Sequence, residues 1–241
     1  PSPLTSQRTK DLIPFAALSA SYFAHVGFFN PYMPLWLKDL GLSLLAIGLI
    51  NALLPATRLF APYFWGWLAD RSGQRNKVMR YCASVALVGA LGLCFQFLDR
   101  PWGLWWLSAM LLLLFLHNSA IMPMTEAALS HLVSSGGSFD ARRYGQVRLW
   151  GSLGFLVTVL LAGAWFEWFG LKHFPIWSLV LMAVVVLSVW SLPEQRETDP
   201  AHPDESAAAV WPVLRQPRVQ WFFASIFFHV LSHISIYVFF S

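Results

Sequence analysis

The sequence predicts an all-α polytopic membrane protein, with a bundle of six helices made of two inverted three-helix repeats. Three observations carry this prediction. Hydrophobic residues make up 57% of the 241 residues and charged residues only 12%, with a mean hydropathy of +0.55, whereas soluble domains carry about 25% charged residues. A series of apolar runs matches the roughly 20 residues that one membrane span needs. The third observation is an internal repeat of three spans.

The apolar runs divide the chain into three predicted parts. These runs cover residues 12–37, 43–68, 78–98, 102–130, 144–166 and 171–192, and a seventh begins near residue 219. The first run is too long for a cleaved signal peptide. Pro, Glu and Asp are abundant between the sixth and seventh runs, which is typical of a linker. We therefore expect a six-helix bundle over 1–192, a cytoplasmic linker over 193–217 and an incomplete second bundle over 218–241.

Basic residues predict the orientation. Eleven Lys and Arg residues fall on loops on the side of the N-terminus, and three fall on the other side, namely Lys38, Arg100 and Lys172. Because cytoplasmic loops carry the excess of Lys and Arg, the N-terminus and the linker are expected in the cytoplasm, with the protein in a bacterial inner membrane. The pI of about 9.3 could suggest nucleic acid, but these bases are spread over short loops, so we exclude that partner.

The internal repeat appears when the spans of one half are aligned with those of the other. At an offset of 97, residues of the second span match those of the fifth: Gly48, Gly66, Asp70 and Gly73 correspond to Gly145, Gly163, Glu167 and Gly170. At an offset of 92, His25 and Pro31 of the first span correspond to His117 and Pro123 of the fourth. Two three-span halves enter the membrane from opposite sides, a layout typical of secondary transporters with a midplane site.

The loop GWLADRSGQRNK, residues 66–77, combines two glycines, an acid and several bases. Glycine permits a sharp turn, and the acid can pair with a base at the helix ends; a plain positive-inside loop is the alternative. The segment resembles the signature loop of the major facilitator superfamily, G-x-x-x-D-R-x-G-R-R/K, and departs from it at Gln74. The resemblance implies a gating role, without substrate contact, for Gly66, Asp70, Arg71, Gly73 and Arg75.

A lone charge in the fifth span points to a binding site. Arg148 lies in YGQVRLWGSLGF, and no other ionisable residue follows it before Glu167. A charge at mid-bilayer costs about 2.5 kcal/mol or more, so it should face a partner. Glu126 shares a helical face with Ser119 and Ser130 in the preceding antiparallel span, and we expect the two charges to meet.

This pair is either a static clamp between helices or part of a substrate site. The segments around Glu126 and Arg148 resemble the lactose permease and phenylpropionate permease branch of the superfamily. There the equivalent acid and arginine face the central cavity and hold the substrate. The resemblance therefore implies substrate binding by Glu126 and Arg148.

Three further residues are candidates for substrate binding. Arg58 and Asn51 lie on one stripe of the second span, together with Pro55 and Pro62. Arg58 could attract an anion, or its guanidinium could satisfy carbonyls freed by the prolines. His25 could line the cavity from the first span, or it could simply be packed in the core.

We expect neither a cofactor nor a metal. His229 and His233 have helical spacing that could hold zinc, but no third ligand stands out near them. The sequence contains no phosphate-binding loop. No cluster of nucleophile, base and orienting group suggests an enzyme.

The function expected from these features is secondary active transport. The favoured substrate is a small organic solute, an aromatic or other carboxylate, taken up with protons by alternating access. A sugar or nucleoside proton symporter and a non-transporting scaffold or sensor remain open alternatives. The resemblance implies twelve spans, so the expected partners are the substrate, protons, the lipid bilayer and a second six-helix bundle of a longer chain. The chain stops inside an apolar run, and we expect it to be a fragment.

Overall fold

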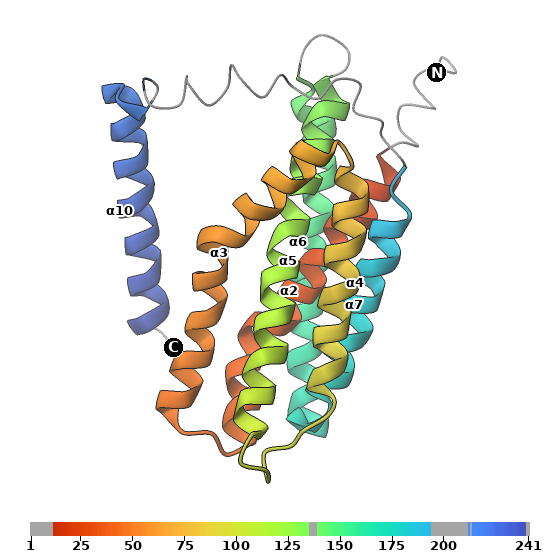
Figure 1. Ribbon diagram of the computed structural model, residues 1–241, viewed down its shortest axis with the longest axis vertical. Coiled ribbons are helices and arrows are strands. Elements are labelled where there is room, and N and C mark those ends of the chain that lie inside the picture. The colour runs from red at the N-terminus through yellow and green to blue at the C-terminus, as the bar shows by residue number, and fades with distance from the viewer. Residues whose placement is uncertain (1–11, 135–138, 194–211, 213, 240–241) are drawn as a thin grey trace. The chain divides into compact units, whose positions relative to one another are not determined.

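The computed structural model describes residues 12–134, 139–193, 212 and 214–239, with side chains up to residue 229. The chain divides into two compact units, Pro1–Glu197 and Thr198–Ser241. Most of the predicted linker lies outside the described residues. Figure 1 traces the helices of each unit in chain order.

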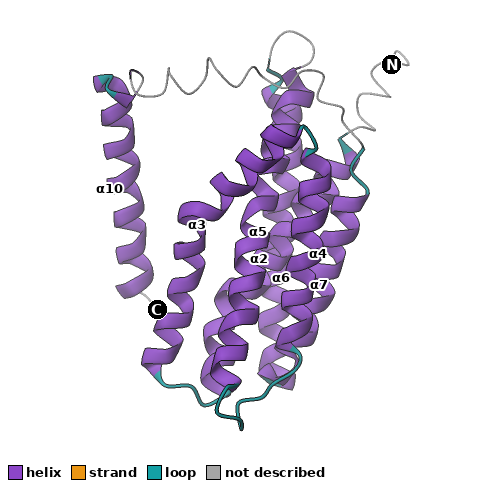
Figure 2. Ribbon diagram, in the orientation of Figure 1, coloured by secondary structure: helices purple, strands orange, loops and turns teal. Residues whose placement is uncertain are grey.

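Helices account for every regular element in the described ranges (Figure 2). In the first unit they are α2 Ile13–Asp39, α3 Leu44–Ser72, α4 Arg75–Leu93, α5 Gly103–Ser134, α6 Ala141–Phe169, the short 3-10 helix η1 Leu171–His173, and α7 Phe174–Trp190. The second unit contains α10 Pro217–Phe239. Each predicted apolar run corresponds to one helix in the predicted order, which confirms the all-α assignment.

Several helices of the first unit are suited to a membrane. Those that are long and apolar enough to cross it are α3, α5, α6 and the stretch Leu171–Trp190. The sequence predicted spans in α2 and α4 as well. Their hydropathy is lower because α2 carries polar side chains such as Ser21 and His25, and α4 begins with bases that include Arg75. Both helices nevertheless pack against the apolar helices, α2 on α6 and α4 on α5.

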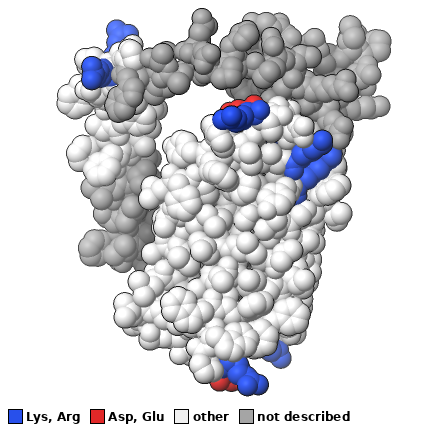
Figure 3. All heavy atoms as spheres, in the orientation of Figure 1, with Lys and Arg blue, Asp and Glu red and all other residues white. Residues whose placement is uncertain are grey.

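The surface of the first unit separates charged from apolar regions. On the face drawn in Figure 3, its charged atoms lie at the two ends, and the surface between them carries none. Large apolar side chains, among them Leu59, Leu160 and Leu187, are more than 60% exposed. Soluble proteins rarely expose a continuous apolar surface of this kind. The first unit is therefore an integral membrane bundle.

Contacts between the helices follow the predicted repeat. The main pairs are α2 with α6, α3 with α5, α4 with α5, α2 with α7, and α4 with α7. The repeat makes α2 equivalent to α5, α3 to α6, and α4 to α7. Each contact in this set then has an equivalent contact in the same set; for example, α2 with α6 corresponds to α5 with α3. Gly73 and Gly170, which the alignment made equivalent, cap the ends of α3 and α6 with φ of +62° and +70°. Both positions need a conformation that glycine adopts without strain.

Glycines bring α2 and α6 unusually close together. A Cβ on Gly154 would lie 2.3 Å from the Ala20 carbonyl oxygen, and one on Gly27 would lie 2.7 Å from that of Phe155. Small residues at helix contacts allow such approach inside membranes. The contact sets the position of the first turns of α6, which carry Arg148, against α2.

Candidate substrate site

Glu126 and Arg148 form the centre of the candidate site. Arg148 Nη1 donates a hydrogen bond to Glu126 Oε1 across α5 and α6, and the two side chains form an ion pair. The predicted meeting of these charges is thus confirmed. The side chains keep 36% (Glu126) and 42% (Arg148) of their surface exposed. Both groups therefore retain capacity for additional hydrogen bonds.

Local structure explains why the pair forms. Asp140 caps the start of α6 by accepting a hydrogen bond from the Arg143 amide at 3.1 Å. A carboxylate that caps a helix satisfies an otherwise unpaired amide and fixes where the helix begins. Arg148 then lies two turns into α6, where the antiparallel α5 presents Glu126.

Helix α2 completes one wall of the site with aromatic rings. The guanidinium carbon of Arg148 lies 5.5 Å from the centre of the Phe23 ring, within the range of a cation–π interaction. Tyr22 packs edge-on against Phe23, with ring centres 5.5 Å apart. Tyr22 also lies within electrostatic range of both Arg58 and Glu126. Residues of α2, α3, α5 and α6 therefore converge at this site.

Arg58 supplies a second positive charge from α3. It is exposed, and it makes no hydrogen bond or ion pair with any residue that the structure describes. Pro55 and Pro62 lie inside the same helix, which bends in its middle (Figure 1). Asn51 is half-buried on the same helical face, two turns before Arg58. Arg58 is thus available to an anionic partner.

His25 lies in the core of the bundle. Its side chain is 1% exposed and stacks on Phe29 with ring centres 5.3 Å apart. Neither ring nitrogen finds a hydrogen-bond partner in the described part of the chain. Its repeat equivalent His117 differs, because Nδ1 lies 2.8 Å from the Leu113 carbonyl oxygen. In this conformation His25 is shielded from solvent, unlike Glu126 and Arg148.

The segment 66–77, predicted as a loop, is mostly helical, because α3 continues to Ser72 and α4 begins at Arg75. Its charged residues form a separate cluster at these helix ends. Asp70 accepts a hydrogen bond from Arg75 at 2.9 Å, with the Asp70 side chain 68% exposed. Arg71 lies over the Trp67 ring at 5.4 Å. A Cβ on Gly66 would meet open space, and Gly73 makes the turn possible. These are the residues expected to act in gating.

The same end of the bundle is tied to the end of α7. Asn76 Nδ2 donates a hydrogen bond to the Pro193 carbonyl oxygen at 2.7 Å, and Arg80 donates one to that of Leu192 at 3.5 Å. Arg80 also lies over the Trp190 ring at 5.2 Å. The start of α4 thus holds the chain where it leaves the first unit.

Sequence reasoning missed two residues of the site. Phe23 was not singled out, because α2 is apolar on most sides and its aromatic residues give no distinguishing pattern. Gly151 was also missed, although its Cβ would lie 2.6 Å from both Phe23 and Ser19 Oγ. The pair of glycines in WGSLGF was the available signal, since closely spaced small residues mark a helix contact.

Metal ligands do not gather in the described ranges. Among these residues, no group of three or more His, Cys, Asp and Glu side chains could hold an ion. His229 belongs to α10 in the second unit, and the side chain of His233 lies outside the described residues. The structure therefore does not test whether the two histidines could share a metal ion.

The chain matches a known protein family and is similar to several named proteins. Residues 17–241 match the MFS_1 like family. The chain is 34% identical to a maltose permease of Geobacillus stearothermophilus over 144 residues, 59% of this chain and 34% of that protein. It is 32% identical to the uncharacterized transporter YwbF of Bacillus subtilis (strain 168) over 154 residues, 62% of this chain and 36% of that protein.

A third relative is named "Probable 3-phenylpropionic acid transporter" and comes from Escherichia coli (strain K12). It is 27% identical over 175 residues, which cover 71% of this chain and 41% of the relative. The chain thus spans less than half the length of the curated relatives it matches.

Proposed function

The chain belongs to the MFS_1 like family, and from this we propose that it forms the substrate-binding first half of a secondary transporter for a small organic solute. Relatives of this chain bear the names of transporters or permeases. An enzyme is disfavoured on the same grounds. A second six-helix bundle in the longer protein would supply the opposite wall of the cavity, and rocking of the two bundles would give alternating access.

The observation that carries this proposal is the exposed pair of Glu126 and Arg148. A clamp that only fastened two helices would be best enclosed, because water weakens an exposed ion pair. Here each partner leaves a third or more of its side chain accessible. A solute can therefore bind the remaining carboxylate lone pairs and guanidinium N–H groups.

The charges of the site favour a carboxylate as solute. Arg148 is compensated by Glu126, whereas Arg58 makes no ion pair with the described residues, so the group carries one excess positive charge. The half-buried ring of Phe23 offers aromatic surface beside these charges, and the buried ring of Tyr22 packs against it. An aromatic carboxylate would use both features, its ring against the aromatic wall and its anion toward the arginines. Asn51 and His25 remain proposed contributors.

A sugar is the second candidate, and nucleosides share its chemistry. The carboxylate of Glu126 can accept hydrogen bonds from sugar hydroxyl groups, and the guanidinium of Arg148 can donate hydrogen bonds to them. One relative is named a maltose permease. The excess charge of Arg58 has no counterpart in such a neutral solute. A scaffold or sensor that kept the fold would need no accessible pair.

Protons are the proposed coupling ion, and the segment 66–77 at the ends of α3 and α4 is the proposed gate. Uptake needs an energy source, and the sequence contains no phosphate-binding loop for ATP. We propose that the protein lies in a bacterial inner membrane, with the N-terminus and the segment 66–77 on the cytoplasmic side, as the distribution of Lys and Arg favours.

The proposal is tested by uptake into proteoliposomes that contain the full-length carrier. Labelled 3-phenylpropionate, its neutral amide and maltose are compared with and without an inward proton gradient. We expect the carboxylate alone to accumulate, in a gradient-dependent way, and Arg58→Gln to weaken its uptake. Uptake of maltose with indifference to Arg58→Gln would favour the sugar, and absence of uptake across a broad solute panel would favour the scaffold.

A further inference from the structure

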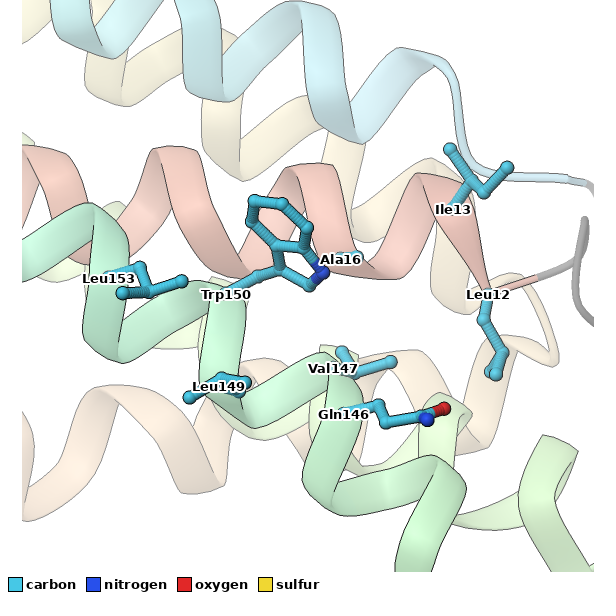
Figure 4. Close-up of a pocket in the computed structure, with 8 residues that line it drawn as sticks. All are labelled: Leu12, Ile13, Ala16, Gln146, Val147, Leu149, Trp150 and Leu153. Carbon is cyan, nitrogen blue, oxygen red and sulfur yellow. The ribbon is translucent and has the colours of Figure 1, made fainter.

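An apolar groove lies between the start of α2 and residues 146–153 of α6 (Figure 4). Its volume is about 300 Å³. Ile13 and Ala16 line it from α2, and Leu149, Trp150 and Leu153 line it from α6. Gln146 adds an amide at the end where both helices begin. The lining of the groove is therefore apolar except at one end, where Gln146 is polar.

This groove is separate from the candidate substrate site. Successive residues of an α-helix turn by about 100°, so Gln146, Leu149 and Leu153 lie roughly 100–160° around α6 from Arg148. Arg148 points toward α5 and Glu126. The groove thus opens on another side of the bundle, where Leu149 and Trp150 are 58% and 55% exposed.

A positive charge lies beyond the polar end of the groove. Arg142 is exposed and precedes Gln146 by four residues, so it lies one turn, about 6 Å, closer to the helix start on the same face. Both helices begin at this end, where their dipoles add positive potential. The carboxylate of Asp140 is occupied as the cap of α6. The apolar groove, Gln146 and Arg142 therefore follow one another along α6 toward its first residue.

We propose that this groove binds one acyl chain of an anionic phospholipid, with the lipid phosphate at Arg142. The order of groups matches the lipid, since the apolar chain precedes the polar ester region and the phosphate in the same direction. Bases near the cytoplasmic surface attract anionic lipids, and this end is the one assigned to the cytoplasm. The assignment depends on that orientation and is independent of the transported solute.

The test uses the full-length carrier, purified in detergent and mixed with phosphatidylglycerol or with phosphatidylcholine of the same acyl chains. Native mass spectrometry counts the retained lipids. Arg142→Gln should remove a preference for phosphatidylglycerol of about fivefold, the ratio expected for one basic group at the surface. Leu153→Trp should fill the groove and lower retention of both lipids. Controls are Arg100→Gln, at the opposite end, and Leu160→Trp, a 64% exposed position of α6 outside the groove.

A photo-crosslinking residue at position 149 gives a second readout that does not need groove-filling variants to fold. A lipid adduct that Arg142→Gln weakens supports the proposal. A crosslink to another segment of the carrier instead of lipid overturns it, because the groove is then a protein interface. Equal retention of the two lipids by the unmodified carrier also overturns it, as does equal loss in the control variants.

Discussion

Gly151 of α6 leaves room for the ring of Phe23 in α2, the same ring that lies 5.5 Å from the guanidinium carbon of Arg148. A single hydrogen atom in place of a side chain thus determines how closely the aromatic wall approaches the arginine. The packing of α2 against α6 and the geometry of the candidate site are coupled at this position.

Replacing Gly151 by alanine should disturb the site from outside it. The added Cβ would lie 2.6 Å from Phe23 Cδ2 and from Ser19 Oγ, so the ring must move. We expect a loss of stability of about 1–3 kcal/mol and weaker solute binding, measured by thermal unfolding and by equilibrium binding to the full-length carrier.

Gly145→Ala is the matched control on the same helix, because a Cβ there meets nothing within 4 Å. Alanine is favoured over glycine inside helices by up to about 1 kcal/mol, so this variant should be neutral or slightly more stable. Equal effects of the two substitutions would mean that the contact with Phe23 is unimportant for binding.

The pair of Glu126 and Arg148 is tested by a double-mutant cycle. Glu126→Gln or Arg148→Gln alone leaves the opposite charge unpaired. For fully buried pairs this costs about 3–5 kcal/mol, and less is expected here because the side chains are 36% and 42% exposed. The double variant should regain thermal stability but should still fail to bind solute. Recovery of full solute affinity in the double variant would identify the pair as a helix clamp.

Asp70→Asn should slow the transport cycle and leave solute affinity unchanged. The Asp70 side chain is 68% exposed where it pairs with Arg75, so its loss should change stability by less than about 1 kcal/mol. Asp99→Asn is the control, since Asp99 pairs with Arg100 and is 77% exposed. The measurements are uptake rate and equilibrium binding. A parental uptake rate in Asp70→Asn would contradict the gating role.

The fold was largely predictable, because each apolar run must satisfy its own backbone hydrogen bonds in the membrane and so becomes a helix. Helix ends were less predictable. The fourth run was predicted to end at residue 130, but α5 continues to Ser134. The length of an apolar run reflects the thickness of the hydrocarbon core of the bilayer. A helix can continue beyond that core into the polar headgroup region as long as its backbone hydrogen bonds persist.

The candidate site was predictable only where it is charged. Glu126 and Arg148 stand out because a lone charge in an apolar span must find a partner. Phe23 cannot be recognised in this way, since an aromatic residue facing a cavity and one facing lipid look alike in the sequence. Burial of His25 was equally open, because helical spacing alone did not distinguish a cavity face from the core.

His25 gives the last prediction, because its two ring nitrogens are buried without partners among the described residues. A buried polar group without a hydrogen bond destabilises a protein by about 1–3 kcal/mol. Replacement by leucine removes that cost together with the stacking on Phe29, so thermal stability should be unchanged or higher. His117→Leu is the repeat-equivalent control and should lower stability, since it removes the contact of Nδ1 with the Leu113 carbonyl oxygen. If His25 acts only in packing, His25→Leu should retain solute affinity. A stable His25→Leu variant without solute affinity would instead show that His25 turns toward the cavity during the cycle and contacts the solute there.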